Sequence, residues 1–179
     1  MSGHGRSGGE IPVLESERLR LRGHRPEDYE DSAALWGDPE VTRYVGGRPL
    51  TKEEVWARLL RYVGHWAWMG YGLWAVEERA TGKFVGEVGY ANHKRDIQPS
   101  LGDMPELGWV LATESHGKGY ATEAVRAATI WGDERFRGQR TACIIHPENV
   151  RSMRVAEKCG FKESGRATYR GEPTLVFSR

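Results

Sequence analysis

The 179-residue sequence contains few cysteines, no long apolar run and almost no excess of charge. Its two cysteines, Cys143 and Cys159, form no CxxC pair and no Cys/His spacing typical of zinc, which argues against a disulfide scaffold and a metal site. No apolar run approaches the ~20 residues of a membrane span, so we expect no membrane partner. Since 26 Lys and Arg face 25 Asp and Glu, we also expect no nucleic-acid partner.

The first ten residues contain almost no hydrophobic side chain. Residues 1–10 are rich in glycine, serine and charge, and we predict a disordered tail there. This stretch also lacks the apolar centre of a secretory signal, which together with the scarcity of cysteine predicts a cytoplasmic protein. Residues 11–179 contain no internal repeat, and their length suits a single domain with one core.

Hydrophobic periodicity predicts a mixed α+β chain. The predicted order of elements is β-α-α-β-β-β-α-β-α-β-β, which differs from the strict alternation of a doubly wound fold. Thr51 and Glu54 have the spacing of a capping box, which predicts the start of the second helix. Two later helices are predicted over residues 120–131 and 149–159. These elements are expected to surround one sheet.

A short glycine-rich stretch separates a predicted strand from the third predicted helix. In "TESHGKGYATEA", residues 113–124, Gly117 and Gly119 flank Lys118. The spacing fits neither a P-loop nor a dinucleotide fingerprint, which would need a third glycine at Thr122. Two glycines at a helix start can aim backbone N–H groups at a pyrophosphate, and the helix dipole favours the same charge. A strand-to-helix turn without a ligand is the alternative that these residues leave open.

Longer stretches around this loop follow one known pattern in order. "HGKGYA" has the form of an acetyl-CoA loop, with His116 where glutamine or arginine is usual. Four further stretches fit the same pattern: "ERLRLRGHRPEDYE", "GLWAVEERATGKFVGEVGY", "ELGWVLATESHGKGYATEA" and "NVRSMRVAEKCGF". On these motifs the chain, over roughly residues 11–179, resembles the GNAT family of N-acetyltransferases and its RimJ/RimL-like branch.

The resemblance implies the GNAT acyl-CoA N-acyltransferase fold, with one mixed, mostly antiparallel central sheet, flanked by helices and splayed between its two central strands. It also implies that acetyl-CoA is the co-substrate, that no metal takes part, and that a primary amine attacks the thioester directly in a ternary complex. The family pattern carries cofactor binding over to Trp109, Val110, Leu111, His116, Gly117, Lys118, Gly119, Tyr120, Ala121, Asn149 and Ser152.

Acetyl transfer to an amine needs a base for the attacking nitrogen, donors for the oxyanion and a proton for the departing thiolate. Glu106 opens the strand before the loop, where the family often carries a carboxylate base. Glu87 on the preceding strand is one alternative, and water alone is another, because orientation supplies much of the rate. The resemblance implies Ser152 as the thiolate's proton donor and a backbone N–H near Val110 as the oxyanion donor.

The acceptor side is expected near the second predicted helix, which begins a cluster of aromatic residues. Trp66 and Trp74 are predicted core residues, whereas Trp66 and Trp68 point to different faces of the helix. One of these two is therefore expected to line the acceptor groove or a homodimer contact. Residues 93–105 are predicted to form a loop that acts as a lid or sets specificity. We expect a protein N-terminal amine as acceptor; the alternatives are a small-molecule amine or a non-catalytic acyl-CoA-binding module.

Overall fold

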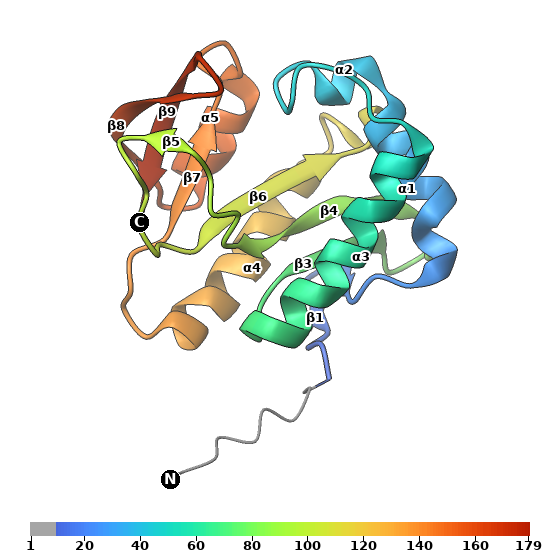
Figure 1. The fold of residues 1–179 in the computed structure, drawn as a ribbon. Coiled ribbons are helices and arrows are strands. Elements are labelled where there is room, and N and C mark those ends of the chain that lie inside the picture. Colours follow the sequence, from blue (N-terminus) through green and yellow to red (C-terminus); the bar gives the residue numbers. More distant parts are fainter. Residues whose placement is uncertain (1–9) are drawn as a thin grey trace, which may run out of the picture.

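The computed structural model describes residues 10–179, and the predicted tail over 1–10 lies outside them except for Glu10. Among the described residues, nine strands form one sheet in the order β1-β2-β3-β4-β6-β7-β9-β8-β5 (Figure 1). The strands are β1 (Leu14–Glu15), β2 (Leu19–Arg22), β3 (Leu73–Glu78), β4 (Phe84–Ala91), β5 (Ile97–Gln98), β6 (Glu106–Leu111), β7 (Ala142–Ile145), β8 (Lys162–Tyr169) and β9 (Glu172–Ser178). The helices are α1 (Tyr29–Gly37), α2 (Pro39–Thr42), α3 (Lys52–Met69), α4 (Tyr120–Phe136) and α5 (Val150–Lys158), with 3-10 turns η1 (Pro26–Asp28) and η2 (Thr113–Ser115).

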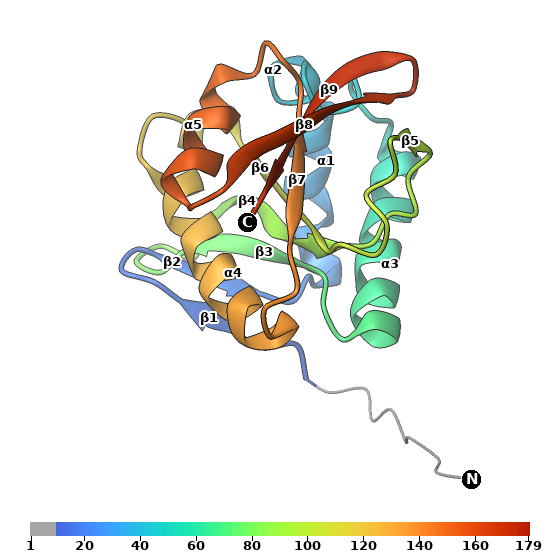
Figure 2. The same cartoon turned by 90° about the vertical axis from the view of Figure 1, so that its left-hand side faces the viewer.

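Helices cover both faces of this sheet. Figure 2 shows α4 and α5 on one side and α1 and α3 on the other. The larger core cluster includes Val125 of α4 and Tyr90 of β4, and a second cluster joins Trp36 of α1 and Val55 of α3 to Phe84 of β4. The α+β fold with helices flanking a mixed, mostly antiparallel sheet is therefore confirmed.

Helix α3 begins and ends as its sequence predicts. Thr51 Oγ1 accepts a hydrogen bond from the Glu54 N–H, and Glu54 Oε2 accepts one from the Thr51 N–H. Gly70 ends the helix with a left-handed φ of 68°, which glycine adopts without steric cost. Trp66 is buried whereas Trp68 is 76% exposed, so the two tryptophans do occupy different faces of α3.

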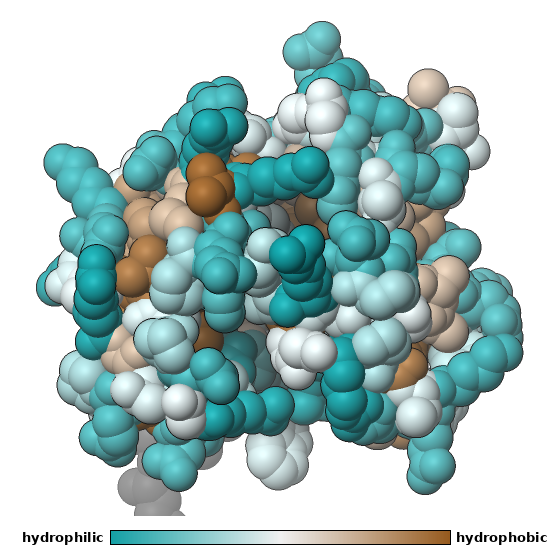
Figure 3. Space-filling view, turned by 90° about the horizontal axis from the view of Figure 1, so that it is seen from above, coloured by the Kyte–Doolittle hydropathy of each residue, from teal (hydrophilic) through white to brown (hydrophobic). Residues whose placement is uncertain are grey.

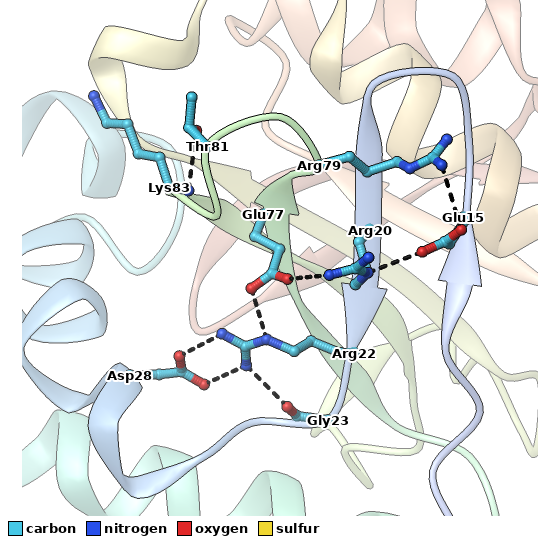
Figure 4. Close-up of polar contacts among 9 residues, drawn as sticks. All are labelled: Glu15, Arg20, Arg22, Gly23, Asp28, Glu77, Arg79, Thr81 and Lys83. Atoms are coloured by element: carbon cyan, nitrogen blue, oxygen red, sulfur yellow. Dashed lines mark hydrogen bonds and ion pairs between the residues drawn. The ribbon is translucent and has the colours of Figure 1, made fainter.

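A chain of ion pairs holds the first strands together (Figure 4). The buried Arg22 of β2 donates from Nε to Glu77 Oε2 of β3 at 2.8 Å and from Nη1 to Asp28 Oδ2 at 2.8 Å. Arg20 continues the chain, reaching both Glu77 and Glu15. Burial raises the pKa of Asp28, but the hydrogen bonds from Arg22 outweigh it, so the pKa lies below its usual value. The network fixes the strand-to-helix turn ahead of α1.

The middle of the sheet is splayed between β6 and β7. β6 pairs with β4 along its full length, from Glu106 to Leu111. With its parallel neighbour β7 it shares a single register pair, Glu106 with Ala142, beyond which the strands diverge (Figure 1). One edge of β6 is therefore open over most of its length, as the family resemblance predicted.

Four segments differ from the sequence expectation: β1 and α2 are additional elements, α4 is longer, and the 93–105 loop contains a strand. α4 continues to Phe136, past the predicted end at residue 131, because Phe136 still packs edge-on against Tyr71 and Tyr90. The loop predicted over 93–105 contains the short strand β5, whose Ile97 pairs with Tyr169 of β8. This pairing fixes the loop against the C-terminal hairpin, where tertiary contacts decide the conformation.

Candidate functional site

The loop between β6 and α4 presents free backbone donors. Gly117 and Gly119 have left-handed φ values of 76° and 79°, which explains why glycine stands at both positions. Within residues 10–179, the N–H groups from Gly117 to Ala121 have no hydrogen-bond partner, whereas the His116 N–H already bonds to the Thr113 carbonyl at 3.1 Å. A Cβ at Gly117 would meet nothing within 4 Å. Open space and unpaired donors at a helix start fit a diphosphate group.

Two side chains, one from a distant part of the chain and one from the loop itself, brace this loop. Arg18 donates from Nη1 to the Lys118 carbonyl at 2.9 Å and forms an ion pair with Glu123 of α4 at 2.7 Å. His116 Nε2 lies 3.0 Å from the Leu111 carbonyl at the end of β6. One brace comes from the β1–β2 connection and the other from the loop itself, and both act on carbonyl groups, at Lys118 and at Leu111.

The backbone N–H groups of β6 point alternately towards β4 and towards the gap between β6 and β7. The Ala112 N–H donates to the Val85 carbonyl of β4, so the Val110 N–H, two residues earlier, also faces β4. Trp109 and Leu111 therefore direct their N–H groups towards the gap between β6 and β7. Of the three β6 residues predicted to meet the cofactor, these two offer backbone donors to the gap, and Val110 does not.

The start of α5 lies across this gap from β6. Asn149 caps the helix, accepting a hydrogen bond from the Ser152 N–H at Oδ1 over 3.2 Å. Ser152 is half-buried, and its hydroxyl has no hydrogen-bond partner among residues 10–179. His146, just past β7, stacks on Tyr44 from the α2 side at 5.2 Å. The contact bridges the two halves of the molecule at the mouth of the gap.

Glu106 forms a nearly buried ion pair at the base of the gap. Both of its carboxylate oxygens accept hydrogen bonds from Arg95, at 2.7 Å from Nε and 2.8 Å from Nη2. Arg95 also donates to the Tyr169 hydroxyl at 2.9 Å. Glu106 and Arg95 border a pocket of about 330 Å³ formed largely by the 91–104 segment. The predicted base thus faces a cavity, but its charge is already matched.

Glu87, the alternative base, is fully buried beneath α1 and α3. Its carboxylate accepts hydrogen bonds from Trp36 Nε1 at 3.0 Å and the Tyr62 hydroxyl at 2.9 Å, with the Ser32 hydroxyl and His24 also within reach. Burial raises the pKa of Glu87, but these donors and the charge of His24 outweigh it and hold the pKa below its usual value. With no exposed surface, Glu87 has no direct path to an acceptor.

Sequence reasoning found the loop and the strand but missed Arg18 and Arg95. Neither arginine belongs to a local motif, because each reaches its partner through tertiary contacts, between Arg18 and Lys118 and between Arg95 and Glu106. Within the described part of the chain, no cluster of His, Cys, Asp and Glu could hold a metal ion. Among these same residues, no helix combines the length and the apolar character needed to cross a bilayer.

Comparison with known proteins gives one consistent family. Residues 18–162 match the acetyltransferase (GNAT) domain. The chain is 33% identical over 173 residues to the uncharacterized protein YkkB of Bacillus subtilis (strain 168), covering 93% of this chain and 94% of that one. It also resembles the crystal structure of an acetyltransferase from Agrobacterium tumefaciens str. C58, with a TM-score of 0.81, 28% identity and 99% of each chain covered.

Two more distant structures share the fold. One is RimL, a ribosomal L7/L12 alpha-N-protein acetyltransferase in complex with coenzyme A, at a TM-score of 0.72 and 16% identity, covering 94% of this chain and 97% of that one. The other is spermidine N-acetyltransferase from Vibrio cholerae in complex with CoA and spermine, at a TM-score of 0.72 and 17% identity, covering 92% and 96%. At these identities the likeness extends to the fold alone.

Proposed function

This chain belongs to the GNAT family and is an acetyl-CoA-dependent N-acetyltransferase, and from that premise we propose that it acetylates the N-terminal amine of a protein by direct attack in a ternary complex. The observation that carries the cofactor site is the run of unpartnered N–H groups from Gly117 to Ala121, among the described residues, at the start of α4. The class of acceptor is inferred from the groove in front of β6.

The pyrophosphate of acetyl-CoA is proposed to bind the N–H groups of Gly117 to Ala121. Lys118 adds positive charge, and Arg18 holds its carbonyl and so the loop. The direction of these N–H groups, together with the helix dipole of α4, favours binding of a dianionic diphosphate. The pantetheine arm then lies between β6 and β7, where the backbone of Trp109 and Leu111 can bond it like a neighbouring strand.

The reaction joins the amine nitrogen to the thioester carbonyl carbon and breaks the bond between that carbon and sulfur. We assign the oxyanion to the N–H of Trp109 or Leu111, because the Val110 N–H faces β4. Ser152, whose hydroxyl is unpartnered within residues 10–179 and lies at the first turn of α5, is proposed to donate a proton to the departing thiolate. Asn149 orients it by capping the helix.

The amine must lose a proton before it attacks. Glu106 is proposed to accept that proton through water, since its carboxylate borders the pocket but is bound on both oxygens by Arg95. Each carboxylate oxygen keeps a second lone pair for the water. Arg95 then acts as a positioning residue that fixes the orientation of Glu106.

A protein N-terminus suits a groove that is open at its mouth. The pocket beside Glu106 is lined partly by the exposed loop residues His93 and Lys94 and, within the described chain, by no helix residue. RimL, which shares the fold, is named for acetylation of a protein α-amine. A small-molecule amine is the second candidate, because spermidine N-acetyltransferase has the same fold.

Steady-state assays with acetyl-CoA test these assignments. Peptides with free and with blocked N-termini are compared for thiol release and for mass gain, and only the free termini are expected to react. Glu106→Gln is expected to lower kcat at least ~100-fold, the range of general-base catalysis, with the Kd of CoA unchanged. Glu134→Gln, an exposed change on α4, is the matched control and is expected to keep full activity.

Because Glu106→Gln leaves Arg95 without its partner, the melting temperature of each variant is measured alongside kcat. A folded Glu106→Gln protein with near-normal kcat would remove Glu106 from the mechanism. Equal reaction of peptides and blocked peptides would contradict the N-terminal acceptor.

A further inference from the structure

Two arginines on α3 face the acceptor side with no acidic partner. Within residues 10–179, no carboxylate lies within 4.0 Å of Arg58 or Arg61, which stand one helical turn apart. Arg58 lies over the Trp36 ring at 3.8 Å and donates from Nη1 to the Tyr62 hydroxyl at 3.2 Å. Its Nε is buried and has no hydrogen-bond partner in the described chain. A buried guanidinium donor left unsatisfied indicates that an acceptor group is missing.

Both arginines line a pocket of about 250 Å³, completed by Leu50, Glu54 and Ala57. Glu54 does not neutralise them, because its carboxylate is already engaged by Arg48 and by the Thr51 N–H. Partial burial lowers the pKa of Arg61, and the positive charges of Arg58 and Arg95 lower it further. The pocket therefore holds a positive charge that the described residues leave uncompensated.

The position of this pocket relates it to the reacting atoms. Tyr62, which Arg58 contacts, bonds to Glu87 of β4, and Glu87 lies opposite Val110 of β6 in the sheet. In Figure 2, helix α3 and the segment carrying β5 both lie on the side of the sheet opposite α4 and α5. The top of the molecule, seen in Figure 3, is covered largely by hydrophilic side chains, with apolar ones between them around a central hollow.

We propose that the acceptor carries an acidic group next to its amine, and that Arg58 and Arg61 bind this group. This inference rests on the proposed acetylation of an amine. Guanidinium groups match carboxylates in shape and charge, and bidentate pairing would satisfy the orphan donor of Arg58. The same charge disfavours polyamines, since each added ammonium group would enter a cationic pocket without compensation.

The test compares matched acceptors under one set of conditions. Three tetrapeptide amides share an N-terminal alanine and differ only in their second residue, which is aspartate, asparagine or lysine; free aspartate and spermidine complete the panel. We expect kcat/KM for the aspartate peptide to exceed that for the lysine peptide at least tenfold. Arg61→Gln is expected to reduce kcat/KM for the aspartate peptide about tenfold and to leave the asparagine peptide nearly unchanged.

Arg126→Gln is the matched control, because Arg126 is an exposed arginine on α4, on the opposite face of the sheet. It is expected to keep the preference for aspartate. Arg58→Lys serves as a second variant that retains the charge but not the planar fork, and it is expected to lower kcat/KM for the aspartate peptide without changing the Kd of CoA. If free aspartate is preferred over the peptide, the acceptor that carries the acidic group is a small-molecule amine.

Binding separates this inference from the proposed function. Calorimetry of the aspartate peptide with the CoA-loaded protein is expected to give a Kd about tenfold lower than for the lysine peptide, an advantage lost in Arg61→Gln. If no amine is acetylated but this binding difference persists, the proposed function fails and the anion site stands. Equal binding of both peptides, faster acetylation of spermidine, or an aspartate preference that survives Arg61→Gln would overturn the inference.

Discussion

At the scale of single residues, a substitution at Gly117 is expected to affect both the stability of the fold and the binding of CoA. Its left-handed φ strains any other residue, yet a Cβ there would meet no atom within 4 Å. We expect Gly117→Ala to lower the free energy of unfolding by ~1 kcal/mol and also to weaken CoA binding several-fold, because the strain is relieved by turning the loop donors away. Urea unfolding and calorimetry with CoA measure the two effects.

Gly138→Ala is the control for this substitution. Gly138 has a φ of 84°, a Cβ there would also meet nothing within 4 Å, and it lies after α4, away from the loop. The stability loss should be similar while the Kd of CoA stays the same. If both variants bound CoA as tightly as the native protein, the loop would not be the diphosphate site.

At the scale of elements, two helical glycines give opposite predictions. Gly64 in α3 faces open space, so Gly64→Ala is expected to raise the free energy of unfolding by ~0.5–1 kcal/mol through helix propensity. In α4, a Cβ on Gly132 would lie 2.5 Å from the hydroxyl of Tyr90, which is fully buried. Gly132→Ala should cost ~1–3 kcal/mol by overpacking. Thermal and urea unfolding of both variants would decide this, and a stabilised Gly132→Ala would refute the packing of α4 on β4.

The ion pairs joining β2, β3 and η1 predict a pH dependence. Burial raises the pKa of Asp28, and the Arg22 hydrogen bonds bring it below its usual value. A carboxyl with a lowered folded pKa stabilises the protein above the unfolded pKa of about 3.9, and this contribution disappears as pH falls through the folded pKa. Asp28→Asn should therefore lose ~3 kcal/mol at pH 7, with the gap to the native protein closing below pH 4.

Urea unfolding at pH 7, 5, 4 and 3 follows that gap. Asp103→Asn is the control, since Asp103 forms an exposed pair with Lys94 at 3.2 Å and should alter stability little at any pH. A gap between the native protein and Asp28→Asn that stayed constant from pH 7 to 3 would contradict the role of Asp28.

At the scale of the whole molecule, the buried thiols report on global unfolding. Cys143 and Cys159 are both buried, and burial raises the pKa of each thiol. We expect neither to react with a disulfide reagent at pH 8 in the folded protein, and both to react in concentrated urea. Rapid labelling of the folded protein would show that α4 and α5 separate from the sheet under native conditions.

The sequence indicates most of the architecture because its signals are local. The capping box at Thr51, the two glycines at 117 and 119 and the alternation along the strands each act within a few residues. The pairing of Arg95 with Glu106 and the open edge of β6 depend on how distant strands meet, and no spacing in the chain specifies them. The same holds for the isolation of Arg58 and Arg61, since the lack of a partner is a property of the assembled groove.

The divergence of β6 from β7 has a consequence for solubility. It leaves a row of unpaired backbone groups in the middle of the sheet. Such groups normally occur at an edge strand, where extended peptides can pair with them and start aggregation. If the amide-bearing arm of the coenzyme fills that row as proposed, it shields the sheet while it delivers its acetyl group. The coenzyme-free protein should then aggregate more readily on storage than the coenzyme-bound protein.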